Sequence, residues 1–223
     1  MKSSFLSSTI GLKIVMGVSG ALLGLFLIAH VIGNLEIFIG ADAINHYGVL
    51  LRTLPPLLWA MRIGLLVLVV LHIWSAVRLW ALNRAARPVG YAVKRNQTTT
   101  LFARTMIYSG IIVAAFVVYH ILHFTTHDVE RSYEHLLDLE GRHDIFGMVT
   151  DAFRRPAVAG FYVLSVVLLG FHLSHGIASM IHTLGMNHPR YNPTWRHVGA
   201  VIAALITIGF VMVPLAILAG VVR

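Results

Sequence analysis

Five long apolar runs, separated from one another by polar segments, dominate the pattern of this chain. They cover roughly residues 12–33, 57–82, 104–126, 156–183 and 198–221. A helix rises about 1.5 Å per residue, so each run is long enough to cross a hydrocarbon layer about 30 Å thick. We therefore expect an all-α membrane protein with five transmembrane helices, in which residues 1–223 form a single transmembrane domain.

The composition supports this class. Hydrophobic residues make up 57% of the chain and charged residues 12%, against about 45–50% and 25% in soluble domains. Cysteine is absent, which excludes disulfides, thiolate-bound clusters and cysteine nucleophiles. The first run is too long for the apolar part of a secretory signal and lacks a small-residue cleavage site. Within this run, Gly17, Gly20 and Gly24 are expected to let a neighbouring helix approach closely.

The polar segments differ strongly in charge. All nine acids lie in residues 34–56 and 127–155, whereas the N-terminus and the segments 83–103 and 184–197 are basic and free of acids. We expect residues 34–56 to form a loop, and residues 127–141 to form an amphipathic surface helix. The positive-inside rule places the N-terminus in the cytoplasm of a bacterial or archaeal cell, with the chain in its cytoplasmic membrane. The net charge of +8 is thus a matter of membrane topology, and no nucleic-acid partner is expected.

Histidines at matched depths are the candidate chemistry. Counted from the cytoplasmic ends of their runs, His30 and His120 are about 24–27 Å deep, and His72 and His172 lie near the cytoplasmic side, about 22–24 Å from the outer face. A haem with two axial imidazoles needs two opposed helices that each carry one histidine at equal depth. We predict two stacked, non-covalent b haems inside a bundle of four of the helices, with their levels about 15–20 Å apart. His30 and His120 would be the axial iron ligands of the outer haem, and His72 and His172 those of the inner haem.

Spacing alone leaves several roles open. His123 lies one turn from His120, and His175 lies one turn from His172, so each is an alternative ligand; otherwise each is expected to contact a haem propionate or quinone, or to hydrogen-bond within its span. Arg78 and Arg104 are expected either to pair with propionates or to extend to the membrane interface. The remaining histidines of loops and span ends are expected to be solvated; they are His127, His135, His143, His188 and His197. A haem-free histidine proton relay is a competing function, weakened by the lack of acids inside the predicted spans.

Several segments together resemble a known family. They are GLKIVMGVSGALLGLFLIAHVIGNL, NHYGVLLRTLP, LHIWSAVRLWALNRAARPVGY, VYHILHF and GFYVLSVVLLGFHLSHGIASMIHTLG, and they include all or part of each of the first four runs. In this order they resemble the cytochrome b subunit of the single-subunit, two-haem succinate:quinone oxidoreductases, which include succinate dehydrogenases and fumarate reductases. The haem-ligand positions of that family fall on His30, His72, His120 and His172, in agreement with the count of depths.

The resemblance also implies partners. A flavoprotein with covalent FAD would oxidise succinate, an iron–sulfur subunit would carry the electrons, and this subunit would react with a membrane quinone, usually menaquinone, but not with succinate itself. The basic cytoplasmic face is the expected dock for the iron–sulfur subunit, or else a plain topology signal; it includes Arg84, Arg87, Lys94 and Arg95.

The quinone site and the direction of the reaction stay open. Outer candidates for the quinone site are Glu36, Asn45, His46 and Arg52, and inner candidates are Ser7, Ser8, Lys13 and Arg78. Since no predicted span holds an acid for a transmembrane proton relay, succinate oxidation is favoured over fumarate reduction by the same architecture.

Overall fold

Long helices make up most of the computed structural model, which describes residues 8–86 and 101–223. Five helices of this part are long and apolar enough to span a membrane, as predicted. They are α1 (Thr9–Leu35), α3 (Pro55–Ala85), α4 (Leu101–Phe124), α6 (Pro156–Thr183) and α7 (Asn192–Leu218). The shorter elements are the 3-10 helices η2 (Glu36–Phe38) and η3 (Arg131–His135) and the α-helices α2 (Ala41–Arg52) and α5 (Ile145–Arg154).

Local signals explain where the long helices begin. The Ser8 side chain caps α1 by accepting a hydrogen bond from the amide of Gly11 at 3.0 Å. Helices α3, α6 and α7 each carry proline at one of their first two positions, where the missing amide proton costs no helical hydrogen bond. Because Pro193 starts α7 in this way, the fifth span begins at Asn192, six residues before the predicted 198.

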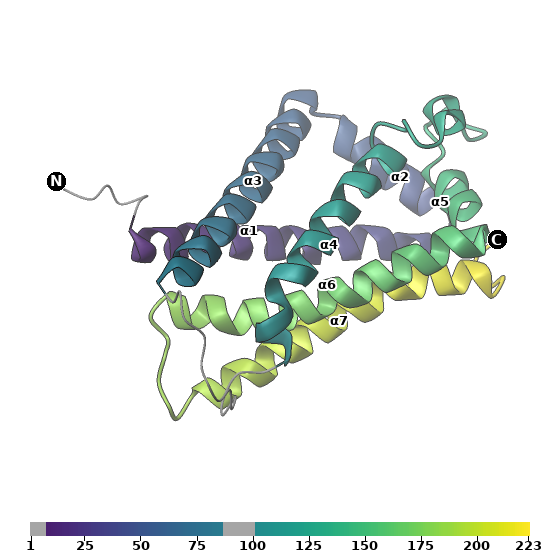
Figure 1. Ribbon diagram of the computed structural model, residues 1–223. Coiled ribbons are helices and arrows are strands. Elements are labelled where there is room, and N and C mark those ends of the chain that lie inside the picture. Colours follow the sequence, from purple (N-terminus) through teal and green to yellow (C-terminus); the bar gives the residue numbers. More distant parts are fainter. Residues whose placement is uncertain (1–7, 87–100) are drawn as a thin grey trace.

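Helices α1, α3, α4 and α6 surround a common interior, and α7 packs along α6 and α1 (Figure 1). Helix α1 packs against both α3 and α6, and α4 packs against α6, whereas α3 and α4 contact each other only sparingly. Helices α1 and α4 therefore lie diagonally across the bundle, and so do α3 and α6. Side chains on these diagonal helices meet in the interior.

Small residues set the closest helix contacts. A Cβ atom built on Gly199 of α7 would lie 3.1 Å from the carbonyl oxygen of Ser174 in α6, so this position brings two backbones together. Of the glycines predicted to admit a neighbour, Gly17 packs against Thr183 of α6 and Gly20 against His72 of α3. Gly24 does not fit the prediction, because nothing lies within 4 Å of a Cβ built there.

Helix α3 buries little of its surface against the rest of the chain. Ser75 and Leu79 are its two buried residues, and both lie within two turns of His72. Many of its large apolar side chains are exposed, for example Leu66 and Val70. In a membrane such a surface faces lipid, so the protein contacts of α3 concentrate around its histidine.

The polar segments beyond the outer helix ends form a folded cap, made of η2, α2 and residues 125–154. The predicted loop at 34–56 is wrong, since most of it is helical in η2 and α2. The predicted surface helix at 127–141 is also wrong: this segment contains the short η3 and an isolated antiparallel bridge between Leu137 and His143. The amphipathic helix of this region is instead α5, one face of which packs into the core.

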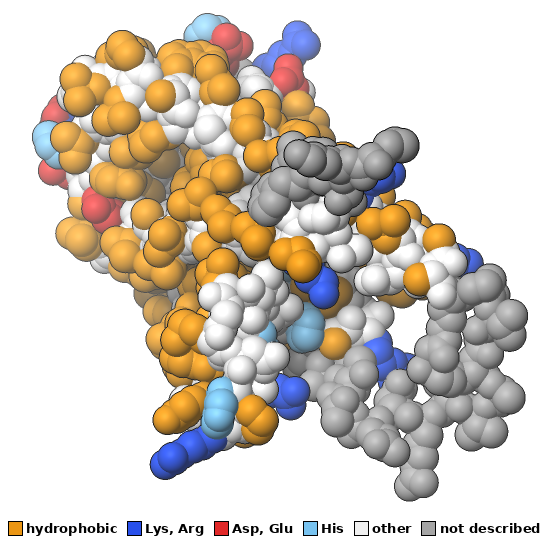
Figure 2. All heavy atoms as spheres, turned by 90° about the vertical axis from the view of Figure 1, so that its left-hand side faces the viewer, with side chains coloured by type: hydrophobic (Ala, Val, Ile, Leu, Met, Phe, Trp, Pro, Cys, Tyr) orange, Lys and Arg blue, Asp and Glu red, His pale blue; other side chains and the backbone are white. Residues whose placement is uncertain are grey.

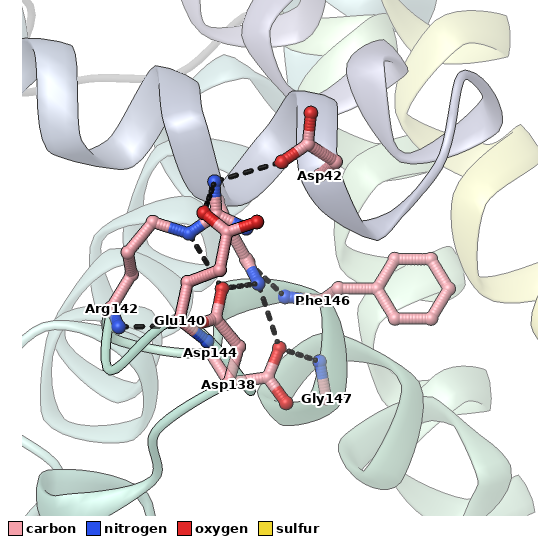
Figure 3. A network of polar contacts seen from close by, with 8 residues as sticks. Asp42, Asp138, Glu140, Arg142, Asp144, Phe146 and Gly147 are labelled. Atoms are coloured by element: carbon pink, nitrogen blue, oxygen red, sulfur yellow. Dashed lines mark hydrogen bonds and ion pairs between the residues drawn. The ribbon is translucent and has the colours of Figure 1, made fainter.

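One buried amide connects the two halves of this outer cap, and Figure 3 labels the residues around it. Asn45 of α2, 1% exposed, donates hydrogen bonds to the carboxylates of Asp138 at 3.0 Å and Asp144 at 3.1 Å. Its Oδ1 accepts a hydrogen bond from the amide of Phe146 at 3.0 Å. Arg142 then joins Asp138 to Asp42 through ion pairs of 2.7 and 2.8 Å. Burial alone would raise the pKa of Asp138, but hydrogen bonds from Arg142 and Asn45 hold it low, at about 2.

Charge separates along the bundle. All nine acids lie in the outer cap. In Figure 2 the red carboxylates appear in the upper part of the view, beside some basic and histidine side chains, while its lower part shows Lys, Arg and His without carboxylates. The described basic residues at the opposite ends of the spans are Lys13, Arg78, Arg84, Arg104, Arg190 and Arg196. The two ends of the bundle therefore differ in charge, as the positive-inside pattern requires.

Candidate functional site

Two pairs of histidines meet inside the bundle, each across a diagonal. The rings of His30 (α1) and His120 (α4) have centroids 5.8 Å apart, and those of His72 (α3) and His172 (α6) are 6.3 Å apart. These are the two pairs expected from the sequence. Because the helices of a pair have little direct contact, the imidazoles bridge the interior between them.

A hydrogen bond to a backbone carbonyl defines the tautomer of His72, one of the two inner histidines. The Nδ1 atom of His72 lies 3.1 Å from the carbonyl oxygen of Met16 and 3.3 Å from Oγ of Ser19. Ser19 donates its own proton to the carbonyl of Val15 at 2.6 Å, so its oxygen acts as the acceptor toward His72. A carbonyl can only accept, and Nδ1 must therefore carry the ring proton of His72, which leaves Nε2 with a free lone pair.

His172 has a serine at the matching position on its own neighbouring helix. Its Nδ1 lies 3.2 Å from Oγ of Ser109, which donates to the carbonyl of Met106 at 3.1 Å. Its Cε1 atom also lies 3.5 Å from a Cβ built on Gly110, just as the ring of His72 lies against Gly20. In both cases a Ser-Gly pair on a neighbouring helix receives the edge of the imidazole.

Sequence reasoning missed these serines, although a signal was present. Ser19 precedes His30 by eleven residues, and Ser109 precedes His120 by eleven residues. At 1.5 Å per residue this spacing separates the levels of the two histidine pairs by about 16 Å. Helices α1 and α4 are thus equivalent: each supports an inner histidine of another helix and supplies an outer histidine itself.

Aromatic rings surround the outer pair. Phe26 stacks on His30 with 5.2 Å between centroids, and Phe210 of α7 lies 5.6 Å from the same ring. Phe116 and Tyr162 each lie 6.0 Å from His120. The amide nitrogen of Asn34, a donor, lies 3.4 Å from Nδ1 of His30, and the buried Nδ1 of His120 has no hydrogen-bond partner among the residues that the structure describes. The outer pair therefore lacks the acceptors that the inner pair has.

Both pairs fit a haem better than a bare metal ion. In the described part of the chain, no three histidine or carboxylate side chains come together as a metal site, but a porphyrin iron needs only two ligands from the protein. An imidazole nitrogen bonds a metal at about 2 Å, so two rings opposed across one ion have centroids roughly 6 Å apart. The observed 5.8 and 6.3 Å and the free Nε2 of His72 agree with this arrangement.

The alternative ligands lie outside the pairs. His123, 3% exposed, shares a hydrogen bond of 3.0 Å with the hydroxyl of Tyr162, so its partner comes from a neighbouring span. That hydroxyl lies on α6, near the outer end of the bundle. His175 is half-buried on α6, and Arg78 and Arg104 are exposed on α3 and α4.

The outer quinone candidates lie at different positions in the outer cap. Asn45 is the buried hub of the outer cap, His46 is exposed on the same helix and Glu36 is half-buried in η2. Burial lowers the pKa of Arg52, and the nearby charge of Arg62 lowers it further. Of the inner candidates, Lys13 and Arg78 lie on α1 and α3 and Ser8 caps α1, while Ser7 lies outside the described residues.

Two histidines that were expected to be solvated are instead partly enclosed. The rings of His127 and His143 lie 5.5 Å apart in the outer cap, and Nε2 of His127 is buried without a hydrogen-bond partner in the described structure. Burial lowers the pKa of His143, and the charges of Arg52 and His127 lower it further. His135, His188 and His197 are exposed, as expected.

At the basic end, Arg84 lies over the ring of Trp80 at 5.6 Å, while Arg87, Lys94 and Arg95 lie outside the described residues.

Compared with protein-family models, with curated proteins and with solved structures, the chain gives no match. The geometry of the histidine pairs and the sequence motifs therefore remain as the indications of function.

Proposed function

We propose that this chain is a dihaem cytochrome b that anchors a succinate:quinone oxidoreductase in the membrane and passes electrons between its iron–sulfur subunit and a quinone. The observation that carries this proposal is the meeting of four histidines, from four different helices, as two diagonal pairs at two levels. The motifs of the first four spans supply the family. The five apolar helices support a location in the membrane.

We assign the following roles to the residues of the two histidine pairs and to their neighbours. His72 and His172 hold the inner haem iron, and His30 and His120 hold the outer one. Bound haem supplies one-electron transfer, and the protein supplies ligands, orientation and a water-poor surrounding. Ser19 and Ser109 keep the inner rings turned so that Nε2 is available, and the aromatic rings around His120 keep water away from the outer level.

The partners follow from the family and from the charge pattern. An iron–sulfur subunit and an FAD flavoprotein would bind at the basic, cytoplasmic end, and menaquinone would react from the membrane. We propose succinate oxidation as the direction, because the interiors of the five spans contain no carboxylate for transmembrane proton transfer; Glu36 lies at the outer end of the first span. Proton release coupled to turnover across sealed vesicles would contradict this direction.

Haem content of the membrane-extracted protein tests the proposal directly. We expect two b haems per chain from the pyridine haemochrome spectrum and a b-type α-band in the reduced-minus-oxidised spectrum. His172→Ala should retain one haem of the two, since removal of one axial ligand abolishes a site without touching the other level.

His175→Ala is the matched control. It removes a half-buried imidazole one turn away on the same helix, and it should keep both haems. Absence of a b-type spectrum in the unmodified protein would reject the cytochrome and favour the haem-free proton relay. If His175→Ala loses one haem and His172→Ala keeps both, then His175 and not His172 is the axial ligand on α6.

A further inference from the structure

The two histidine pairs differ in the hydrogen-bond partners of their Nδ1 atoms. The Nδ1 atoms of both inner rings lie within hydrogen-bond distance of a serine oxygen of a neighbouring helix, at 3.3 Å for His72 and 3.2 Å for His172. Ser19 is 2% exposed and Ser109 is 9% exposed, so water does not compete for these bonds. Neither outer ring has such an acceptor: His30 faces an amide donor, and Nδ1 of His120 has no partner in the described structure.

An acceptor at Nδ1 changes the imidazole as a ligand. A hydrogen bond from Nδ1–H shifts electron density toward Nε2 and makes the ring more basic. A more basic axial ligand stabilises ferric iron over ferrous iron and lowers the reduction potential, and second-shell hydrogen bonding is one of the means by which a protein adjusts haem potentials. Both histidines of the inner pair have an oxygen near Nδ1 that can lower the reduction potential in this way, and neither histidine of the outer pair has one in the described structure.

We propose that Ser19 and Ser109 are positioning residues that hold the inner histidines in the Nδ1–H tautomer and thereby set the reduction potential of the inner haem separately from that of the outer haem. This inference rests on the proposed function. The step concerned is the reduction of ferric to ferrous iron by one electron from the iron–sulfur subunit or a quinol. No bond is broken, and the Nδ1 proton stays on its ring.

The two serines are not expected to contribute equally. His72 keeps the carbonyl of Met16 as a second acceptor at 3.1 Å when Ser19 is replaced. His172 has Ser109 as its one Nδ1 partner in the part of the chain that is described. Ser109→Ala should therefore raise the inner potential more than Ser19→Ala, and the double variant should raise it most.

Ser75→Ala provides a matched control. Ser75 is fully buried on the helix of His72, and its hydroxyl donates to the carbonyl of His72 at 3.0 Å rather than to the imidazole. The same loss of a buried hydroxyl at nearly the same depth should leave both potentials unchanged. Ser109→Thr keeps a hydroxyl oxygen at this position, and it should have the same inner-haem potential as the unmodified protein.

The experiment is an optical redox titration of the membrane-extracted protein, with the low-spin ferric signals followed by electron paramagnetic resonance. The inner component is the one that disappears in His172→Ala. We expect Ser109→Ala to move this component to a more positive potential and to change its resonance signal, while the outer component stays constant. If Ser109→Ala releases the inner haem, retention in Ser109→Thr supports the positioning role, and loss in both variants overturns it.

Failure of this inference is distinct from failure of the proposed function. Two haems with unchanged inner potentials in Ser19→Ala, Ser109→Ala and the double variant would overturn the role of the serines and leave the cytochrome intact. An equal shift in Ser75→Ala would also overturn it. An unmodified protein without haem would remove the proposed function itself.

Discussion

At the scale of single residues, Asn45 shows how a buried amide can organise a surface region. It joins α2 to two aspartates that follow it by more than ninety residues. Its Oδ1 also accepts a hydrogen bond from the amide of Phe146 in the first turn of α5. Both carboxylates also have other donors, Arg142 for Asp138 and the Gly147 amide for Asp144. The Phe146 amide depends on Asn45 for its side-chain partner.

Asn45→Ala should therefore destabilise the outer cap by about 1–3 kcal/mol, the usual cost of leaving a buried polar group unpaired. Hydrogen exchange measures this directly, and the amides of Phe146 and Gly147 should exchange faster in the variant. His46→Ala is the control, because its exposed side chain lies next to Asn45, and exposed substitutions usually change stability by less than about 0.5 kcal/mol. Equal exchange rates in the two variants would contradict the role of Asn45.

At the scale of helices, the long spans could be read from the sequence and the short elements could not. Length and hydropathy are local properties, so each predicted span overlaps an observed helix almost completely. Helix α2 was missed because its polar residues, Asn45 above all, are paired with partners far along the chain. The predicted helix at 127–141 does not form because Asp138 bends the chain by accepting bonds from the amides of Glu140 and Arg142.

For the histidines, too, some features could be predicted from the sequence and others could not. A constant rise per residue let the depth of His30, His72, His120 and His172 be counted from the ends of their spans, and the structure brings the rings of each pair close together. The hydrogen bond between His123 and Tyr162 joins α4 to α6 and depends on how these helices are rotated. Hydropathy carries no information on that rotation, so the sequence left the role of His123 open.

Contact between α6 and α7 depends on small residues, which gives a prediction for that helix pair. Gly199→Leu would drive a side chain into the backbone of α6 near Ser174, and such overpacking costs about 1–3 kcal/mol. Thermal unfolding in detergent should show a lower midpoint. Gly160→Leu on α6 is the control, since nothing lies within 4 Å of a Cβ built there. A midpoint lowered as much by Gly160→Leu as by Gly199→Leu would reject the packing argument.

At the scale of the whole molecule, the bundle contains two similar halves. Helices α1 and α3 form one half and α4 and α6 the other, and each half supplies one outer and one inner histidine. Ser19-Gly20 and Ser109-Gly110 stand at the same place in the two halves. In each half the first helix supplies the outer histidine and the second helix the inner one, and the imidazoles of diagonal helices meet as two pairs. Helix α7 stands outside this relation and supplies no histidine to either pair.

The separation of charge between the two ends predicts how the whole molecule lies in the membrane. The chain has no cysteine, so single cysteines can be placed in it without background reaction. Leu139→Cys in the outer cap and Met186→Cys between α6 and α7 are both at exposed positions. With a membrane-impermeant maleimide, Leu139→Cys should react in intact cells and Met186→Cys only after permeabilisation, because the positive-inside rule predicts the acid-free, basic end on the cytoplasmic side. The reverse order of labelling would place the iron–sulfur subunit's expected docking face outside the cell, and the proposed electron path from a cytoplasmic partner to the inner histidine pair would then be untenable.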